Sequence, residues 1–119
     1  GRDATPEMTL PNPLPEPPYH AVLFVSLRAG ADPAYDRMAE EMHRLALSHP
    51  GCLGSDSARG ADGLGITVSY WRDEASILEW KADARHRTAQ KLGAAAWYSA
   101  YALHVAKVER SYAGPREIP

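Results

Sequence analysis

The order of the apolar segments between residues 20 and 112 limits the fold more than any other feature. Residues 20–28 (HAVLFVSLR) are rich in β-branched and aromatic side chains and predict a strand. Apolar residues then recur at spacings of three and four, which predicts a helix that starts at Pro33 and stops at Pro50-Gly51. A strand followed by an amphipathic helix indicates a mixed α and β domain.

The second half of the chain repeats this alternation around a hairpin. The remaining strands are expected at 52–59, 63–71 and 101–112. Asp62-Gly63 suits the tight turn between the first two of them, because glycine accepts a positive φ. Asp73 can cap a second helix, Gly93 breaks it, and residues 94–101 predict a short helical turn. The predicted order is β-α-β-β-α-β, the ferredoxin-like α+β fold with an antiparallel four-stranded sheet and both helices on one face.

Proline content separates this domain from its N-terminal flank. Residues 1–18 hold six of the ten prolines and show no apolar periodicity, so they predict an extended or disordered tail. The domain is expected over 19–113, with a short C-terminal tail over 114–119. A chain of 119 residues has room for one core of this kind.

Charge and composition exclude several classes of function. The formal charge of -2 offers no basic surface for nucleic acid. No apolar run approaches the roughly 20 residues of a membrane span, and no secretory signal precedes the domain, so a cytoplasmic protein is expected. His43 and His49 have no carboxylate at ligand spacing, so no metal site is predicted.

The strands are apolar on both faces. In the first strand, Ala21, Leu23, Val25 and Leu27 alternate with Val22 and Phe24. The last strand repeats this pattern, and two helices can cover only one face of a sheet. The sequence therefore predicts a homodimer packed sheet to sheet, and the alternative is a monomer with scattered exposed apolar residues.

Three segments resemble the antibiotic biosynthesis monooxygenase family, whose members are dimeric α+β barrels. They are GITVSYW (65–71), DEASILEWKADARHRTAQ (73–90) and WYSAYALHVAKVERSY (97–112). The similarity runs from Tyr19 to Tyr112. The resemblance implies a pocket between the helices and the sheet, where some members oxidise aromatic or quinol-like molecules with O₂ and no cofactor, and others degrade haem.

Two departures from the family pattern bear on the cofactor. The haem-degrading members carry a Trp on the second helix, which Trp80 matches, and an iron-ligating His ten residues later, where this chain has Gln90. They also use an Asn on the first strand, whereas Asn12 in the tail is the sole asparagine here. Glutamine is a poor substitute for an imidazole ligand of haem iron. No cofactor is therefore expected, with haem disfavoured.

The candidate site residues follow from the pocket that the resemblance implies. His86 and His104 are candidate bases, because a near-neutral pKa suits proton abstraction from a phenol or enol. His86 lies about 240° around the helix from Trp80, so it shares a face with Trp80 only if the helix breaks. An exposed His86 and a hydrogen-bonded core His104 are the alternatives. The candidate substrate contacts are Trp80, Ser26, Tyr70, Trp97 and Tyr101.

Three functions fit these residues. The first is a cofactor-independent monooxygenase that oxidises an electron-rich aromatic or polyketide-like small molecule with O₂. The second is a non-redox pocket protein, either a cyclase or a binding module for a hydrophobic ligand. The third, which the missing ligands disfavour, is a haem-binding or haem-degrading protein.

Overall fold

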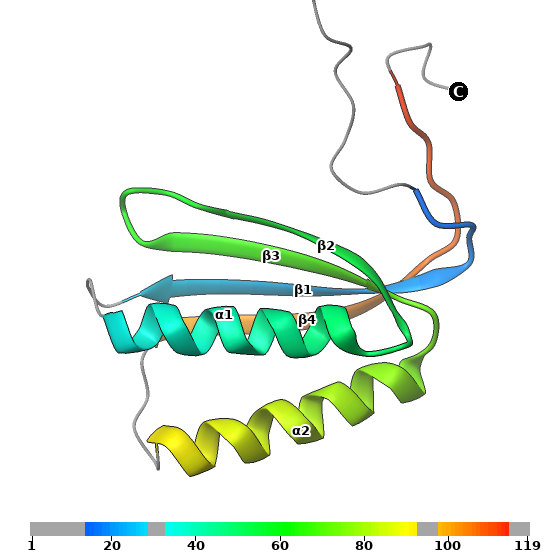
Figure 1. Cartoon of the computed structure of the whole chain (residues 1–119). Helices are drawn as coiled ribbons and strands as arrows, with labels where there is room; N and C mark the ends of the chain where they lie inside the picture. The colour runs from blue at the N-terminus through cyan, green and yellow to red at the C-terminus, as the bar shows by residue number, and fades with distance from the viewer. Residues whose placement is uncertain (1–13, 29–32, 93–97, 115–119) are drawn as a thin grey trace, which may run out of the picture.

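A computed structural model of the chain describes residues 14–28, 33–92 and 98–114, together with the side chains of most of these residues. The elements are β1 (Tyr19–Arg28), α1 (Pro33–Ser48), β2 (Cys52–Arg59), β3 (Leu64–Trp71), α2 (Glu74–Leu92) and β4 (Tyr98–Val108). This order confirms the predicted β-α-β-β-α-β arrangement (Figure 1). Most of the proline-rich segment, residues 1–13, and the end of the C-terminal segment, residues 115–119, lie outside the described residues.

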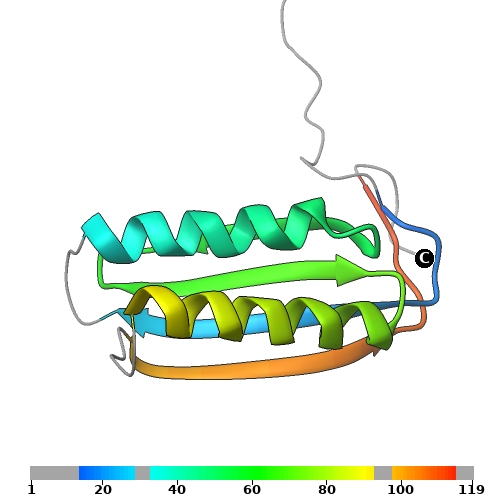
Figure 2. The ribbon, with the colours of Figure 1, turned by 60° about the horizontal axis from the view of Figure 1, so that its bottom comes forward.

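The four strands form one antiparallel sheet in the order β2-β3-β1-β4. Both helices lie on the same side of this sheet (Figures 1 and 2). There α1 contacts β2, α2 contacts β3, and the two helices contact each other. Alternate residues of each strand therefore face the helices, and their neighbours face the open side.

The core lies between the helices and the sheet. Val22 and Trp71 from the strands, Ala46 from α1 and Ile77 from α2 form its buried cluster. Trp71 is fully buried, and its indole N–H donates to the Ser69 hydroxyl at 2.8 Å, so its one polar atom is satisfied. Because Val22 belongs to this cluster, the even-numbered residues of β1 face the helices.

The β2–β3 hairpin forms as its Asp-Gly pair predicts. Gly63 has a φ of 91°, and the Asp62 side chain accepts a hydrogen bond from the Leu64 N–H at 3.1 Å. Asp62 itself has no positive φ, so the glycine alone supplies the left-handed residue. Earlier in β2, a register shift between Cys52 and Gly54 marks a bulge.

The last strand differs from its prediction at both ends. The helical turn expected over 94–101 is wrong for residues 98–101, which already belong to β4 and pair with β1. Alanine-rich sequence favours a helix locally, but pairing with a central strand overrides that preference. The strand also ends at Val108 instead of Tyr112, because Val108 pairs with Tyr19 and the prolines before Tyr19 cannot continue the ladder.

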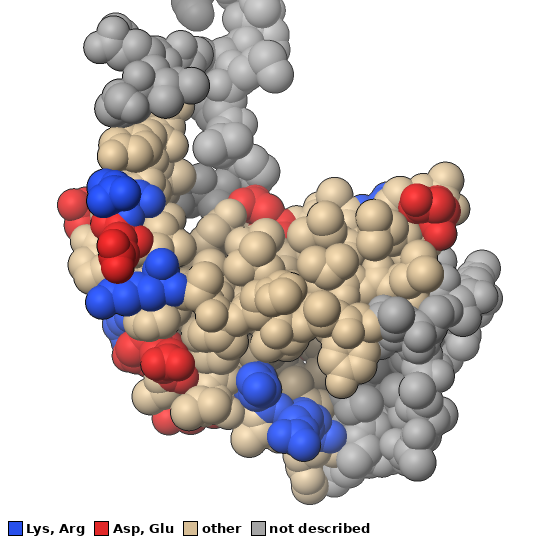
Figure 3. Space-filling model, turned by 180° about the vertical axis from the view of Figure 1, so that it is seen from behind, with Lys and Arg blue, Asp and Glu red and all other residues tan. Residues whose placement is uncertain are grey.

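The open side of the sheet is largely uncharged. Figure 3 shows this side, where charged side chains gather toward the margins of the described surface. The exposed large apolar residues of this face are Leu27, Leu64 and Ile66, each at least 40% exposed. Within the part of the chain that the structure covers, no helix is long and apolar enough to cross a membrane.

Candidate functional site

Two rows of side chains cross the helix side of the sheet near the end of β1. The first row is Arg59, Gly65, Ser26 and Tyr101, and the second is Ser57, Thr67, Phe24 and Leu103. We call these eight residues the floor. Its half on β2 and β3 is polar, whereas its half on β1 and β4 is mostly aromatic and aliphatic, with Ser26 at the boundary. A surface of this composition suits a ligand with one apolar end and one polar end.

The polar half is organised by Arg59. Its guanidinium passes over Gly65 and donates to the Ser26 hydroxyl at 3.2 Å and to the Gly63 carbonyl. A Cβ on Gly65 would lie 2.5 Å from the guanidinium carbon, so only glycine leaves space for this path. Ser26 is 2% exposed, while the Arg59 side chain is exposed. The sheet therefore holds a cation above its surface and fixes its orientation.

The apolar half presents aromatic rings. The rings of Phe24 and Tyr101 lie 5.8 Å apart at an interplanar angle of 51°. Tyr101 is 68% exposed in the single chain, and Leu103 beside it packs against the core. Tilted rings at this distance attract each other and offer a further aromatic a surface on which to stack.

Trp80 on α2 packs against the same core cluster as Leu103 of the floor. Its ring lies 5.5 Å from that of Trp71, and it packs against the core cluster. Its indole Nε1 is buried and has no hydrogen-bond partner. A buried N–H without an acceptor costs about 1–3 kcal/mol, so an acceptor atom of a ligand at this position would gain a bond that the protein leaves unmade.

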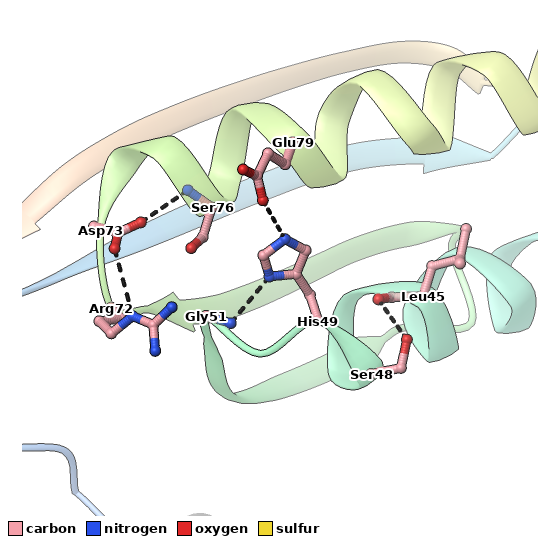
Figure 4. A network of polar contacts seen from close by, with 8 residues as sticks. All are labelled: Leu45, Ser48, His49, Gly51, Arg72, Asp73, Ser76 and Glu79. Atoms are coloured by element: carbon pink, nitrogen blue, oxygen red, sulfur yellow. Dashed lines mark hydrogen bonds and ion pairs between the residues drawn. The ribbon is translucent and has the colours of Figure 1, made fainter.

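A joint between the two helices sets the position of α2 (Figure 4). His49, just after α1, accepts a hydrogen bond at Nδ1 from the Gly51 N–H at 3.0 Å and contacts the Glu79 carboxylate through Nε2 at 2.9 Å. The proton of the neutral imidazole therefore lies on Nε2. The His49 ring also meets Trp71 edge to face at 5.7 Å. His49 therefore links α2, which carries Trp80, to the core through its contacts with Glu79 and Trp71.

The first turn of α2 is fixed from the other side by Asp73. Its carboxylate accepts a hydrogen bond from the Ser76 N–H at 2.8 Å, as the capping prediction requires. This backbone bond, followed by the Ser76 hydroxyl and the neighbouring Arg72, holds the pKa of Asp73 below its usual value. The helix continues without a break from Glu74 to Leu92.

The predicted bases lie apart from the floor. Since α2 does not break, His86 is exposed while Trp80 is partly buried, as the 240° separation implies. His104 pairs with Leu23, so it lies on the open side of the sheet, where it is exposed. The two imidazoles therefore lie on different sides of the molecule.

The predicted substrate contacts divide in the same way. Ser26 and Tyr101 are neighbours in the floor, with Trp80 toward the core. Tyr70 lies on the open side, where its hydroxyl donates to Asp56 at 2.7 Å and its ring meets Tyr19 at 6.0 Å. Burial and the Asp56 carboxylate raise the pKa of Tyr70 to about 12. Trp97 lies outside the described residues.

Two residues near the floor were not singled out from the sequence. His43 on α1 contacts the Ser55 hydroxyl through Nε2 at 2.6 Å, and Ser55 lies on the helix side of β2. Arg59 is the other. The place of Arg59 follows from the Asp62-Gly63 turn, because the hairpin register puts Arg59 opposite Gly65. The sequence therefore contained a signal for the position of this cation, because the predicted hairpin pairs Arg59 with a glycine, Gly65.

The described residues hold no assembled metal site, and the sequence lacks the histidine that the family resemblance implies for haem iron. No three His, Cys, Asp or Glu side chains among them gather as a metal site. His49, which meets Trp71 edge to face, has one nitrogen occupied by Gly51 and the other by Glu79. Gln90 stands where an iron-ligating histidine would be expected, and its side chain lies outside the described set.

Comparison with known proteins identifies relatives over most of the domain. The family model for antibiotic biosynthesis monooxygenases matches residues 18–92. An uncharacterised protein of Bacillus subtilis, YqjZ, is 48% identical over 96 residues, which cover 81% of this chain and 84% of YqjZ. The jasmonate monooxygenase ABM of Pyricularia oryzae is 30% identical over 76 residues, which cover 64% of this chain and 30% of that enzyme.

Solved structures share the fold at low identity. Rv0793 from Mycobacterium tuberculosis has a TM-score of 0.65 at 15% identity, over 80% of this chain and 99% of that one. SnoaB from Streptomyces nogalater, a cofactor-independent oxygenase, has a TM-score of 0.61 at 12% identity, over 80% of this chain and 97% of SnoaB. An MhuD mutant with two manganese protoporphyrin IX molecules bound per active site has a TM-score of 0.59 at 18% identity, over 82% and 100%. At these identities the likeness supports the fold alone.

Proposed function

The chain belongs to the antibiotic biosynthesis monooxygenase family, and from this premise we propose that it oxidises a small, electron-rich aromatic molecule with O₂ without a bound cofactor. The observation that carries the proposal is the floor, where Phe24 and Tyr101 offer aromatic rings beside a polar half built on Arg59 and Ser26. The flat ring of such a molecule can stack on the aromatic half of the floor, and its acidic or phenolic oxygens can bind the polar half.

The second support is the unpaired indole of Trp80. In the proposed complex the substrate ring lies between α2 and the floor, and one of its oxygens accepts the Trp80 N–H. The pairing would orient the ring and remove an uncompensated buried donor. The substrate, once deprotonated, would supply the electrons for O₂.

We propose His43 as the base that removes the proton from the substrate. Its Nε2 contacts Ser55, a residue on the helix side of the sheet, at 2.6 Å, whereas both ring nitrogens of His49 are occupied by Gly51 and Glu79. A neutral imidazole is suited to accept a proton from a phenol or enol near neutral pH. The first-choice candidates His86 and His104 serve as comparisons, because both are exposed away from the floor.

Oxygen consumption tests the activity directly. Purified protein is mixed with anthrone-type or quinol substrates, and O₂ uptake is followed with an electrode. We expect uptake above the uncatalysed rate, with a drop of about 10²-fold or more in His43→Gln and little change in His86→Gln. Product that forms at the same rate without oxygen would overturn the oxygenase proposal.

A non-redox pocket protein is the second candidate, and one observation favours it. Neither His86 nor His104 lies at the floor, so the site is less rich in bases than the family resemblance suggests. A cyclase or binding module would need the rings and the cation of the floor but no reaction with O₂. Binding of aromatic ligands without oxygen uptake is the result expected for this function.

We also propose that two copies pack through the open sides of their sheets. Leu27, Leu64 and Ile66 are exposed there, and burial of apolar area stabilises association by roughly 25 cal/mol per Å². Light scattering should give twice the chain mass for the native protein and a single chain mass for Ile66→Glu. Thr67→Glu, which places the same charge one residue on and on the helix side, should not dissociate the dimer; a monomeric native protein would refute the proposal.

A further inference from the structure

We propose that Arg59 and Ser26 form an anchor for a carboxylate on the ligand that occupies the floor. This inference deepens the proposed function, on which it depends for the location of the ligand. It concerns which molecules bind, and it can be tested without any measurement of oxidation.

The anchor combines a fixed cation with a buried hydroxyl. The guanidinium is held by Ser26 at 3.2 Å and by the Gly63 carbonyl, and it lies against Gly65 with no side chain beneath it. A guanidinium matches the two oxygens of a carboxylate in plane, and charge-assisted hydrogen bonds of this kind are about twice as strong as neutral ones. The Arg59 side chain is exposed, and a guanidinium has five N–H donors, so a ligand that approaches along the floor can bind it in addition to its partners within the protein.

The hairpin alone does not require this arrangement. Arg59 reaches across β3 to β1, the third strand of the sheet order, where its target Ser26 is 2% exposed. If Arg59 only stabilised the turn, its hydrogen bond to the Gly63 carbonyl would be sufficient. The reach over Gly65 places positive charge at the boundary between the polar and aromatic halves of the floor.

The spacing of the rows limits the ligand further. Ser26 and Tyr101 are partners on neighbouring strands, which lie about 4.8 Å apart. The cation therefore stands one strand spacing from the ring that would stack on the ligand. This distance fits a carboxylate attached to the aromatic ring directly or through one carbon, and it is too short for a long acyl linker.

Paired probes that differ in charge alone test the anchor. Binding of 2-naphthoate and of its neutral amide is measured by calorimetry near neutral pH. We expect the native protein to prefer the acid about tenfold, and Arg59→Gln to reduce the preference to about one by weakening the acid alone. Arg110→Gln removes an exposed arginine beyond the other end of β4 and should retain the preference.

Two further variants separate recognition from folding. Arg59→Lys keeps the charge but not the planar fork, so its preference should fall between those of the native protein and Arg59→Gln. Gly65→Ala displaces the guanidinium by its Cβ while retaining Arg59, and it should lose the preference as Arg59→Gln does. Each variant is first checked by thermal unfolding, so that a loss of fold is not read as a loss of the anchor.

The outcomes separate the anchor from the oxygenase. Equal affinity of the native protein for both probes, no saturable binding of naphthoate, or an unchanged preference in folded Arg59→Gln would overturn the anchor. A protein that prefers naphthoate but consumes no oxygen with any quinol keeps the anchor and loses the oxygenase proposal. A protein that oxidises neutral quinols but binds both probes equally supports the oxygenase proposal and overturns the anchor.

Discussion

Gly51 occupies the tightest contact of the joint between the helices, so Gly51→Ala should destabilise the fold. A Cβ on Gly51 would lie 2.0 Å from the Ser76 hydroxyl oxygen and 2.4 Å from the Ser76 Cβ. Neither partner can move freely. The Gly51 N–H is bonded to His49 at 3.0 Å, its carbonyl accepts from the Arg72 N–H at 2.7 Å, and the Ser76 N–H is bonded to Asp73 at 2.8 Å.

The size of the effect follows from these distances. Carbon atoms pack at about 3.5–4.0 Å, so the start of α2 would have to move away from Gly51 by about 1 Å. Overpacking of this kind costs about 1–3 kcal/mol. A loss of about 2 kcal/mol lowers the melting temperature of a domain of this size by about 10 °C. The displaced helix carries Trp80, so the affinity for aromatic ligands should fall as well.

Thermal unfolding followed by circular dichroism measures the loss. Gly60→Ala is the matched control, because its Cβ would lie 2.8 Å from Asp62 Oδ1 at the end of an exposed side chain, and 3.7 Å or more from every other atom near it. Its cost should stay within about 0.5 kcal/mol. Ser76→Gly, which alone costs about 1 kcal/mol in a helix, should restore much of the loss in Gly51→Ala. A Gly51→Ala protein that melts like the native one, or a loss unaffected by Ser76→Gly, would refute the argument.

Three other outcomes are expected. Ile77 is 2% exposed in the core, so Ile77→Ala should lower the free energy of unfolding, measured by urea titration, by about 2–4 kcal/mol. A loss below about 0.5 kcal/mol, which is typical of a surface substitution, would contradict the placement of Ile77 in the core. Because the pKa of Tyr70 is raised to about 12, its contribution to stability is complete below pH 10 and is lost as the pH rises toward 12; spectrophotometric titration should show a late-ionising component that is absent in Tyr70→Phe. Because the pKa of Asp73 is lowered, its contribution is present above the ordinary value of 3.8 and is lost as the pH falls through the lowered folded-state value, so acid unfolding should begin at higher pH in Asp73→Asn than in the native protein.

The fold was predictable because each local signal agreed with the next. The Asp-Gly turn, the Asp73 cap and the helical spacing after Pro33 are all determined within a few residues. The start of β4 was not predictable in this way. Residues 98–101 form a strand because Arg28, Leu27 and Ser26 lie beside them, and this partner is about seventy residues away in the sequence.

The site was less predictable than the fold. The position of Trp80 against the core and the exposure of His86 both follow from helical geometry, and the structure shows both. The side of the sheet on which His104 lies depends on pairing with Leu23, which alternation alone left open because both faces of β1 are apolar. Arg59 acquires its place only from the hairpin register and from the missing side chain of Gly65.

The same register connects the floor with the proposed dimer. On β3 the residues that face the helices are Gly65, Thr67, Ser69 and Trp71, whereas the open side receives Leu64, Ile66, Val68 and Tyr70. A strand that turns most of its aliphatic residues away from its own helices leaves an apolar face exposed, which is the face that we propose a second copy covers. Small and polar residues on the helix side leave room for the Arg59 guanidinium and a ligand. A slip of one residue would exchange the two sets, bury aliphatic residues under the helices and remove the floor, so one choice of register accounts for both surfaces.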